Sequence, residues 1–245
     1  MTFTTRRLAM WSGPRNLSTA LLRAFENRPD TSVVDEPLYA CYLAATGKDH
    51  PGREDVLAAQ DRDWRRVLAT LAGPVPGGRP LFYQKHMAHH LLAGIDRGPL
   101  DALDHAFLIR DPARMLVSLD KVTPGPDLED TGLPPQVELF RRVRQRTGVT
   151  PPVLDSADVL ADPRGQLIAL CAAWDVPFDE AMLAWPLGPR PTDGVWARHW
   201  YAAVERSTGF GEPRSGSVTL PAHLREVHAA CAPLYEELHE SRLRS

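Results

Sequence analysis

Lysine and cysteine are both scarce in this chain of 245 residues. Only three of its 28 basic residues are lysines, at positions 48, 85 and 121. Because arginine serves as the general cation, a lysine in a special place carries more information than usual. The three cysteines, Cys41, Cys171 and Cys231, are widely spaced and form neither a disulfide framework nor a zinc-ligand pattern. This cysteine usage predicts a reducing, cytoplasmic setting.

Long apolar runs and an excess of charge of one sign are also missing. No stretch approaches the roughly 18 consecutive apolar residues of a transmembrane helix, and the N-terminus lacks a signal-peptide core. The net charge of −3 gives no overall basic field for nucleic acid. We therefore expect neither a membrane nor a nucleic-acid partner. Length and composition predict a single domain over residues 1–245, in which residues 186–245 add an aromatic loop and a closing helix.

The N-terminal region reads as strand, turn and helix. Leu8–Trp11 is an apolar run of the length of a buried strand, and apolar residues at helical spacing follow up to Phe25. The turn between them is Ser12-Gly13-Pro14-Arg15-Asn16-Leu17-Ser18-Thr19. Unpaired amides at a helix start, a guanidinium and two hydroxyls suit an anion, so the turn predicts phosphate binding. The alternative is an ordinary turn without a ligand.

Further apolar runs alternate with helical patterns along the chain. Strands are expected at Ser32–Asp35, Leu81–Gln84, His105–Arg110 and Pro152–Asp155. This alternation predicts an α/β fold in three layers, P-loop-like, with a central parallel sheet of about five strands flanked by helices.

Polar residues gather where two of these strands end. Asp35-Glu36-Pro37 closes one strand, and Lys85-His86 directly follows another, with His89 and His90 a helical turn later. Open parallel sheets bind ligands at the carboxyl ends of their strands. Two alternatives stay open, namely a solvated loop at Glu36 and a surface helix that begins with the histidines. The histidine spacing also suggests metal, but no flanking carboxylate or cysteine completes a zinc set.

A second candidate anion site lies at Arg110. The expected strand ends in this arginine, Asp111 and Pro112 start a helix, and Ser118 lies two turns into that helix. A planar guanidinium binds phosphate through two hydrogen bonds. The alternative is a strand end with an incidental serine.

Three stretches later in the chain complete the expectations. Thr123–Pro135 reads as a mobile flap, Gln136–Arg146 as a short basic helix, and Pro221–Ser241 as an amphipathic helix that Pro233 kinks. Tyr39, Tyr42, the flap and the late aromatic residues could line a pocket for a substrate.

The turn is not a Walker A motif, which requires G-x-x-x-x-G-K followed by Ser or Thr. From Gly13 onward, Ser18 replaces the second glycine and Thr19 the lysine. The pattern G-P-R-x-x-S-T instead resembles the 5′-phosphosulfate loop of sulfotransferases that use 3′-phosphoadenosine 5′-phosphosulfate (PAPS), although Asn16-Leu17 stands where many bacterial members have Ser-Gly. The segment Ile-Arg-Asp-Pro-Ala-Arg-Met-Leu-Val-Ser, ending at Ser118, resembles the 3′-phosphate motif of the same family.

The resemblance implies sulfuryl transfer from PAPS as co-substrate to a hydroxyl or amine of a small-molecule acceptor, without a metal. It implies that Gly13–Thr19 hold the 5′ end of the donor, that Arg110 and Ser118 bind the 3′-phosphate, and that a late basic residue, Arg198, assists them. Lys85 would contact the leaving oxygen. The base would be His86, with His89 as substitute, or Glu36, which follows an equivalent strand in several bacterial members.

Two other readings remain open from the sequence. One is an ATP-dependent P-loop kinase or NTPase, which the missing Gly-Lys disfavours. The other is a non-catalytic nucleotide-binding module on the same fold. The oligomeric state and the identity of the acceptor are not encoded in a readable pattern.

Overall fold

A five-stranded parallel sheet forms the centre of the computed structural model, which describes residues 5–213 and 216–244. Its strand order is β2-β3-β1-β4-β5, and each neighbouring pair runs parallel. The strands are β1 (Arg6–Ser12), β2 (Thr31–Asp35), β3 (Leu81–Met87), β4 (Asp104–Ile109) and β5 (Val153–Asp155).

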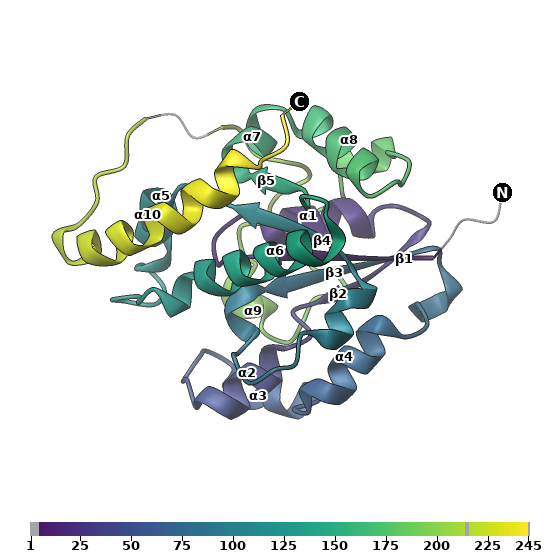
Figure 1. The fold of residues 1–245 in the computed structure, drawn as a ribbon, viewed down its shortest axis with the longest axis horizontal. Coiled ribbons are helices and arrows are strands. Elements are labelled where there is room, and N and C mark those ends of the chain that lie inside the picture. The colour runs from purple at the N-terminus through teal and green to yellow at the C-terminus, as the bar shows by residue number, and fades with distance from the viewer. Residues whose placement is uncertain (1–4, 214–215, 245) are drawn as a thin grey trace.

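Helices cover both faces of this sheet (Figure 1). The main helices are α1 (Ser18–Glu26), α2 (Tyr39–Thr46), α3 (Arg53–Ala59), α4 (Trp64–Ala72), α5 (Pro112–Leu119), α6 (Leu133–Thr147), α7 (Ser156–Ala161), α8 (Pro163–Ala173), α9 (Ala197–Trp200) and α10 (Arg225–Glu240). Short 3₁₀ turns at Pro76–Gly78, Ala88–His90, Gly98–Ala102, Glu129–Thr131, Glu180–Leu183 and Ala222–Leu224 complete the elements.

The alternation of side chains along each strand explains the three layers. In β1, Ala9 and Trp11 pack into one core with residues of α4, α5, α6 and α10. Leu8 and Met10 point to the other face, where α1 and α8 supply the partners. Side chains of successive strand residues point to opposite faces, so a strand covered on both sides is apolar throughout. The predicted three-layer α/β fold is therefore confirmed.

All five strands end at the same edge of the sheet because they are parallel. Three of the predicted strand boundaries shift there. β1 reaches Ser12, and β4 ends at Ile109, one residue before Arg110. β3 continues to Met87 and so contains Lys85 and His86, which the sequence placed just beyond the strand.

Two differences in the later part of the chain involve prolines. The predicted helix at Gln136 begins three residues earlier, at Leu133, because two prolines fit its first turn, where their missing N–H groups need no partner. The closing helix α10 continues through Pro233, at which the sequence predicted a kink. Within residues 5–213 and 216–244, no helix has the length and apolarity to cross a bilayer.

Candidate active site

A cavity with a volume of about 580 Å³ lies at the carboxyl edge of the sheet. Every strand of the sheet, or the residues directly after it, contributes to its wall. The lining includes Arg15, Ser18, Thr19, Glu36, Tyr39, Lys85, Met87, His89, His90, Arg110, Ser118, Ser156, Tyr201 and Tyr235. A cavity of this size accommodates a nucleotide-sized ligand.

The loop between β1 and α1 has an unusual backbone. Arg15 and Leu17 have positive φ angles of 63° and 73°, which side-chain-bearing residues adopt at a cost in energy. Leu17 occupies the cap position of α1, and the first amide that returns to its carbonyl is that of Ala20, at 3.1 Å. The loop therefore leads into a helix start whose first amides have no acceptor within the helix, which is the backbone arrangement of an anion site.

Buried side chains hold this loop in place from below. Ser156 Oγ donates to the carbonyl of Asn16 at 2.9 Å and lies 2.8 Å from the carbonyl of Ile109. With its amide in the orientation that satisfies both ends, Gln136 accepts from the Gly13 N–H at 3.0 Å. A Cβ on Gly13 would lie 2.3 Å from the carbonyl oxygen of Thr131. The close approach explains why glycine occupies this position.

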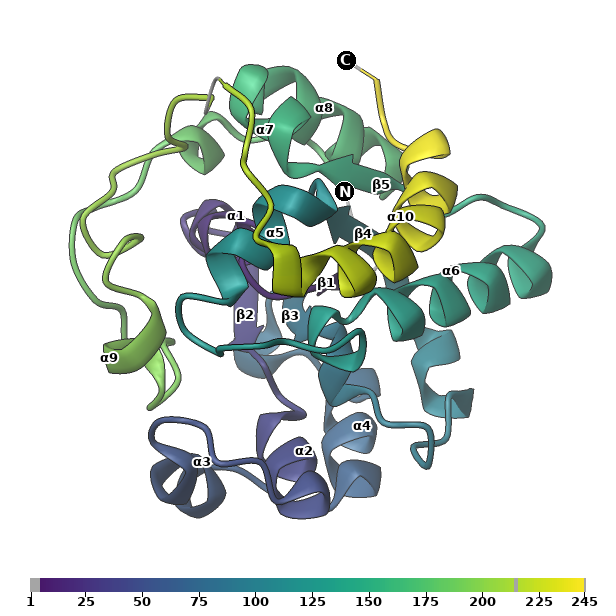
Figure 2. The same ribbon diagram turned by 90° about the vertical axis from the view of Figure 1, so that its left-hand side faces the viewer.

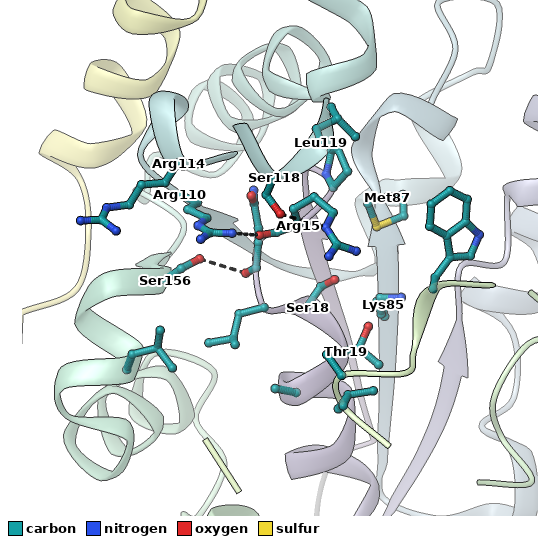
Figure 3. A pocket seen from close by; sticks show the side chains of 18 of the residues that line it. Arg15, Ser18, Thr19, Lys85, Met87, Arg110, Arg114, Ser118, Leu119 and Ser156 are labelled. Carbon is teal, nitrogen blue, oxygen red and sulfur yellow. Dashed lines mark hydrogen bonds between the residues drawn. The ribbon is translucent and has the colours of Figure 1, made fainter. Parts of the chain in front are cut away.

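The two predicted anion sites meet in one place (Figure 3). Arg15 Nε donates to Ser118 Oγ at 3.2 Å, and Arg110 Nη1 donates to the backbone carbonyl of Arg15 at 2.6 Å. The loop after β1 and the helix after β4 thus share a cationic corner that contains two guanidinium groups. Arg114, a turn further along α5, directs its guanidinium to the carbonyl of Gly216.

Lys85 occupies the other side of the cavity and is almost fully buried. Its Nζ donates to Asp35 Oδ1 at 2.8 Å, to Glu36 Oε1 at 2.6 Å and to the hydroxyl of Tyr201 at 2.6 Å. β2 pairs with β3 so that Asp35 stands opposite Lys85 in the sheet. Glu36, directly after β2, has a φ angle of 41°. Its backbone is therefore in the positive-φ region, like that of Arg15 and Leu17 across the cavity. Strained backbone of this kind is typical of functional sites.

Burial sets the protonation of this cluster. Burial alone would lower the pKa of Lys85, but the carboxylates of Asp35 and Glu36 outweigh it and hold that pKa well above 10.5. Burial raises the pKa of Glu36 above its usual 4.5, Lys85 opposes this rise, and Asp35 adds to it. Lys85 is therefore a permanent cation, while Glu36 accepts a proton more readily than an ordinary carboxylate.

His86 lies on the face of β3 opposite to Lys85, because neighbouring residues of a strand point in opposite directions. Its ring stacks on Trp11 with centroids 4.1 Å apart, and its Nε2 lies 3.2 Å from Gln84 Oε1. Burial lowers the pKa of this imidazole to about 3. The geometry does not support the predicted role of His86 as the base, since the side chain points into the core and away from the cavity.

His50, His89 and His90 are among the histidines that do line the cavity. His90 stacks on Tyr39 at 4.6 Å between centroids, and the Tyr39 hydroxyl lies 2.9 Å from His50 Nδ1. Burial, together with the positive charge of a protonated His50, lowers the pKa of His89 to about 3. These imidazoles are neutral at pH 7 and are weak bases, so they form an uncharged wall.

Arg198 stands apart from the cavity. It is exposed on α9, where its guanidinium pairs with Asp55 and its Nε lies 3.1 Å from His199 Nε2. The predicted contact of Arg198 with a nucleotide is not supported by this position. In the described parts of the chain, no group of three or more His, Cys, Asp or Glu residues has the arrangement of a metal site.

Several residues that form the cavity were missed or misread in the sequence. Asp155 was predicted only as the end of the fifth strand and Ser156 was not singled out as a site residue, yet both lie at its wall, and Ser156 anchors the loop after β1. Tyr201 appeared only as one of several late aromatic residues. Because parallel sheets bind ligands at the carboxyl ends of their strands, the residues after the fifth strand could have been predicted to line the site as well. No local pattern announces Tyr201, because it reaches the cluster from 116 residues beyond Lys85.

A parallel sheet whose carboxyl edge gathers a loop suited to anions, two arginines and a buried lysine is suited to binding an anionic ligand and to stabilising negative charge. Comparison with known proteins defines the class further. The family model described as "Sulfotransferase domain" matches residues 6–242. The chain therefore belongs to the sulfotransferase-domain family, and this membership supports sulfotransfer as its chemistry.

Solved structures agree on the fold. The sulfotransferase domain from the curacin biosynthetic pathway has a TM-score of 0.54 at 12% identity, with 94% of this chain and 99% of that chain covered. A sulfotransferase from Alicyclobacillus acidocaldarius has a TM-score of 0.55 at 13% identity, with 97% of this chain and 95% of that chain covered.

Two curated relatives come from Arabidopsis thaliana and are named branched-chain-amino-acid aminotransferase-like proteins 1 and 2. They are 38% and 35% identical to this chain, over 93% and 96% of its length. The chain spans only 40% and 42% of their lengths. Their names describe longer proteins.

Proposed function

We propose that this chain transfers a sulfuryl group from PAPS to a hydroxyl or amine of a small-molecule acceptor. The observation that carries the proposal is the meeting, in one cavity, of the strained loop 13–17, the Arg15–Arg110–Ser118 corner and the Lys85–Glu36 pair. In this proposal the loop binds the 5′-phosphosulfate and the corner binds the 3′-phosphate. The Lys85–Glu36 pair supplies the cation and the base.

The anion-binding groups of the cavity suit the two phosphate ends of PAPS, the sulfuryl donor. The 5′-phosphosulfate would lie on the amides at the start of α1 and on the hydroxyls of Ser18 and Thr19. The 3′-phosphate would lie on the guanidinium of Arg110 and on Ser118. Arg15, which already contacts Ser118, is close enough to this corner to serve the 3′ end as well as the loop. This differs from the assignment of Arg15 to the 5′ end alone.

The transfer itself needs a base and a cation. The acceptor oxygen or nitrogen forms a bond to sulfur while the bond from sulfur to the bridging phosphate oxygen breaks. The proton of the acceptor goes to Glu36, whose raised pKa and place at the cavity wall suit a general base. Lys85 stabilises the negative charge that develops on the leaving oxygen of 3′,5′-diphosphoadenosine.

A product assay tests this proposal. The protein is incubated with PAPS and a panel of hydroxyl- and amine-bearing small molecules, and sulfated products are sought by mass spectrometry. We expect a sulfated product that Lys85→Ala abolishes. Release of phosphate or ADP from ATP with Mg²⁺, without any sulfated product, would contradict the proposal and favour a kinase or NTPase.

A further inference from the structure

Two carboxylates flank Lys85, although the proposed reaction needs only one base. Asp35 and Glu36 are neighbours in sequence, and both accept a hydrogen bond from Lys85 Nζ. The Tyr201 hydroxyl lies closer to Asp35 than to Glu36. The inference drawn from this difference rests on the proposed sulfotransfer and concerns the same cavity.

The Tyr201 hydroxyl has one proton and two carboxylates within reach. Its oxygen lies 2.5 Å from Asp35 Oδ2 and 3.4 Å from Glu36 Oε1. A short bond to a charged acceptor is stronger than a long one, so the proton goes to Asp35. Asp35 then accepts two charge-assisted bonds, one on each oxygen, from Lys85 and Tyr201.

Glu36, in contrast to Asp35, accepts hydrogen bonds on one carboxylate oxygen only, among the described residues. These bonds reach Oε1, so Oε2 remains for a proton from outside. We infer that Tyr201 is a positioning residue that fixes Asp35 as the permanent counter-ion of Lys85 and reserves Glu36 as the base that takes the acceptor's proton.

The lysine supports this division. An ammonium group has three N–H donors, and those of Lys85 point to Asp35, Glu36 and Tyr201. When Glu36 takes up a proton during the reaction, its attraction for the ammonium weakens, whereas Asp35 and Tyr201 keep theirs. One N–H then becomes available for the leaving oxygen at the moment that oxygen gains charge.

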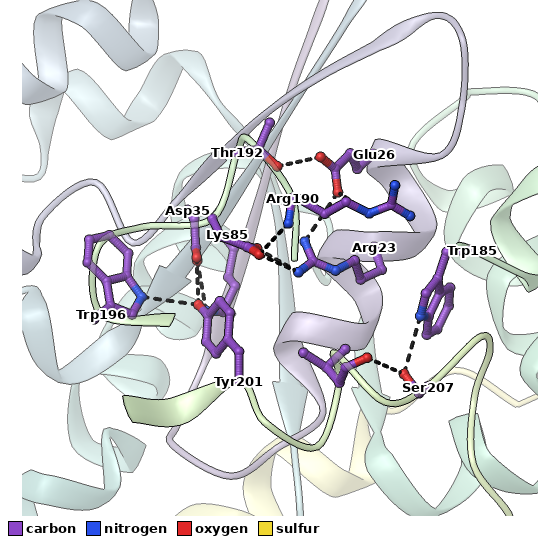
Figure 4. Close-up of polar contacts among 12 residues, drawn as sticks. Arg23, Glu26, Asp35, Lys85, Trp185, Arg190, Thr192, Trp196, Tyr201 and Ser207 are labelled. Carbon is purple, nitrogen blue, oxygen red and sulfur yellow. Dashed lines mark hydrogen bonds and ion pairs between the residues drawn. The ribbon is translucent and has the colours of Figure 1, made fainter. Parts of the chain in front are cut away.

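Tyr201 is held firmly from its own side (Figure 4). Trp196 Nε1 donates to the Tyr201 oxygen at 3.2 Å, and both rings are buried in a core with residues of α2 and α3. The segment that leads to them is tied to α1 by the pair of Arg23 and Asp193, whose closest atoms are 2.6 Å apart. The helix that begins at the predicted phosphosulfate loop thus also anchors the segment that carries Tyr201.

The effect of removing the hydroxyl follows from the groups that face Glu36. These are Asp35 from β2, Lys85 from β3, Tyr39 from α2 and Tyr201, while His90 is a neutral neighbour of Tyr39. The charge of Asp35 disfavours the charged form of Glu36, and the hydrogen bond that Tyr201 donates to Asp35 offsets part of that charge. Tyr201→Phe should therefore raise the pKa of Glu36 further, and Asp35→Asn should lower it.

The test is a ¹³C NMR titration of carboxyl-labelled glutamate in the full chain, with Glu36 assigned through the signal lost in Glu36→Gln. We expect the Glu36 midpoint to move up in Tyr201→Phe and down in Asp35→Asn. Tyr83→Phe is the matched control, because this buried tyrosine of β3 has a hydroxyl without a hydrogen-bond partner among the described residues. Its Glu36 midpoint should equal that of the wild type.

An unchanged Glu36 midpoint in Tyr201→Phe overturns the inference. An upward shift of the Glu36 midpoint in Asp35→Asn also overturns it. The titration needs no turnover, so its result does not depend on whether the proposed function is correct. In the product assay, Tyr201→Phe should lower kcat by about tenfold with little change in KM for PAPS, and the acidic limb of the pH profile should move to higher pH. Absence of any sulfated product from the wild type would count against the proposed function alone.

Discussion

At the scale of single residues, the chemistry of the cavity depends on what surrounds each titratable group. Glu36 and His89 both line the cavity, and burial moves their pKa values in opposite directions. Water stabilises the charged form of an exposed carboxyl, so burial raises the pKa of Glu36 and makes it the stronger base. The same burial makes His89 a weaker base than an ordinary imidazole.

Glu36→Gln tests this assignment directly. We expect kcat to fall about a hundredfold or more, since the variant cannot accept a proton, while affinity for 3′,5′-diphosphoadenosine stays close to that of the wild type. His89→Gln should cost far less. The rates come from the product assay and the affinities from calorimetry. If the large loss occurred in His89→Gln and not in Glu36→Gln, the roles would have to be exchanged.

The acidic limb of the pH profile gives a second measure of Glu36. The base must be deprotonated to work, and its pKa is raised above 4.5. Activity should therefore rise with pH through a midpoint above 4.5, and this limb should be lost in Glu36→Gln. A profile without an acidic limb, measured as kcat/KM over about pH 4 to about pH 8, would contradict a carboxylate base.

At the scale of elements, the site depends on how closely the loop after β1 approaches the start of α6. A Cβ at position 13 would lie 2.3 Å from the carbonyl oxygen of Thr131, which belongs to the 3₁₀ turn just before that helix. The predicted flap at Thr123–Pro135 thus includes a turn that supports the loop. Any side chain at position 13 would push these two elements apart.

Gly13→Ala should lower the free energy of unfolding by about 1–3 kcal/mol, because the new Cβ would overlap a backbone oxygen that cannot rotate away. It should also weaken nucleotide binding, since the loop must shift. Gly94→Ala is the matched control, because no heavy atom of the described residues lies within 4 Å of the place that a Cβ would take there. Urea unfolding compares the stability of the two variants. Equal stability would show that the loop tolerates displacement.

The strands were predictable because each is an apolar run between polar turns, and the two anion sites because Gly13–Thr19 and Arg110–Ser118 are local patterns. The orientation of His86 was not predicted because the strand was ended too early. Once β3 includes Lys85, the alternation of side chains places His86 on the other face. Tyr201 was beyond prediction, since its contacts with Asp35 and Lys85 arise only from the tertiary packing of α2, α3 and α9 (Figure 2).

At the scale of the whole molecule, buried histidines link folding to pH. Burial lowers the pKa of His86 and His89 to about 3 and that of His105 to about 4, from 6.5 in an unfolded chain. Below pH 6.5 the unfolded chain therefore binds protons that the native state does not. The stability that these groups contribute is present above pH 6.5 and is lost as the pH falls toward 3–4.

We expect the free energy of unfolding to decrease from about pH 6.5 to about pH 4, with a contribution of up to about 1.4 kcal/mol per pH unit from each histidine. Urea unfolding at several pH values measures this slope. His105→Gln replaces the titrating group by a neutral one. It should reduce the slope of the unfolding free energy against pH by the contribution of about one proton, up to about 1.4 kcal/mol per pH unit. Stability that stayed constant over this range would mean that the histidines titrate normally in the folded protein.

Calorimetric binding of 3′,5′-diphosphoadenosine, measured in parallel with ATP and Mg²⁺, tests whether the cavity binds the nucleotide of PAPS. We expect binding of the diphosphate in preference to ATP. Arg110→Ala should weaken it by about 2 kcal/mol, roughly thirtyfold, through loss of a charge-assisted contact, and Ser118→Ala should weaken it less. A preference for ATP that requires Mg²⁺, or diphosphate binding that Arg110→Ala leaves unchanged, would contradict this expectation.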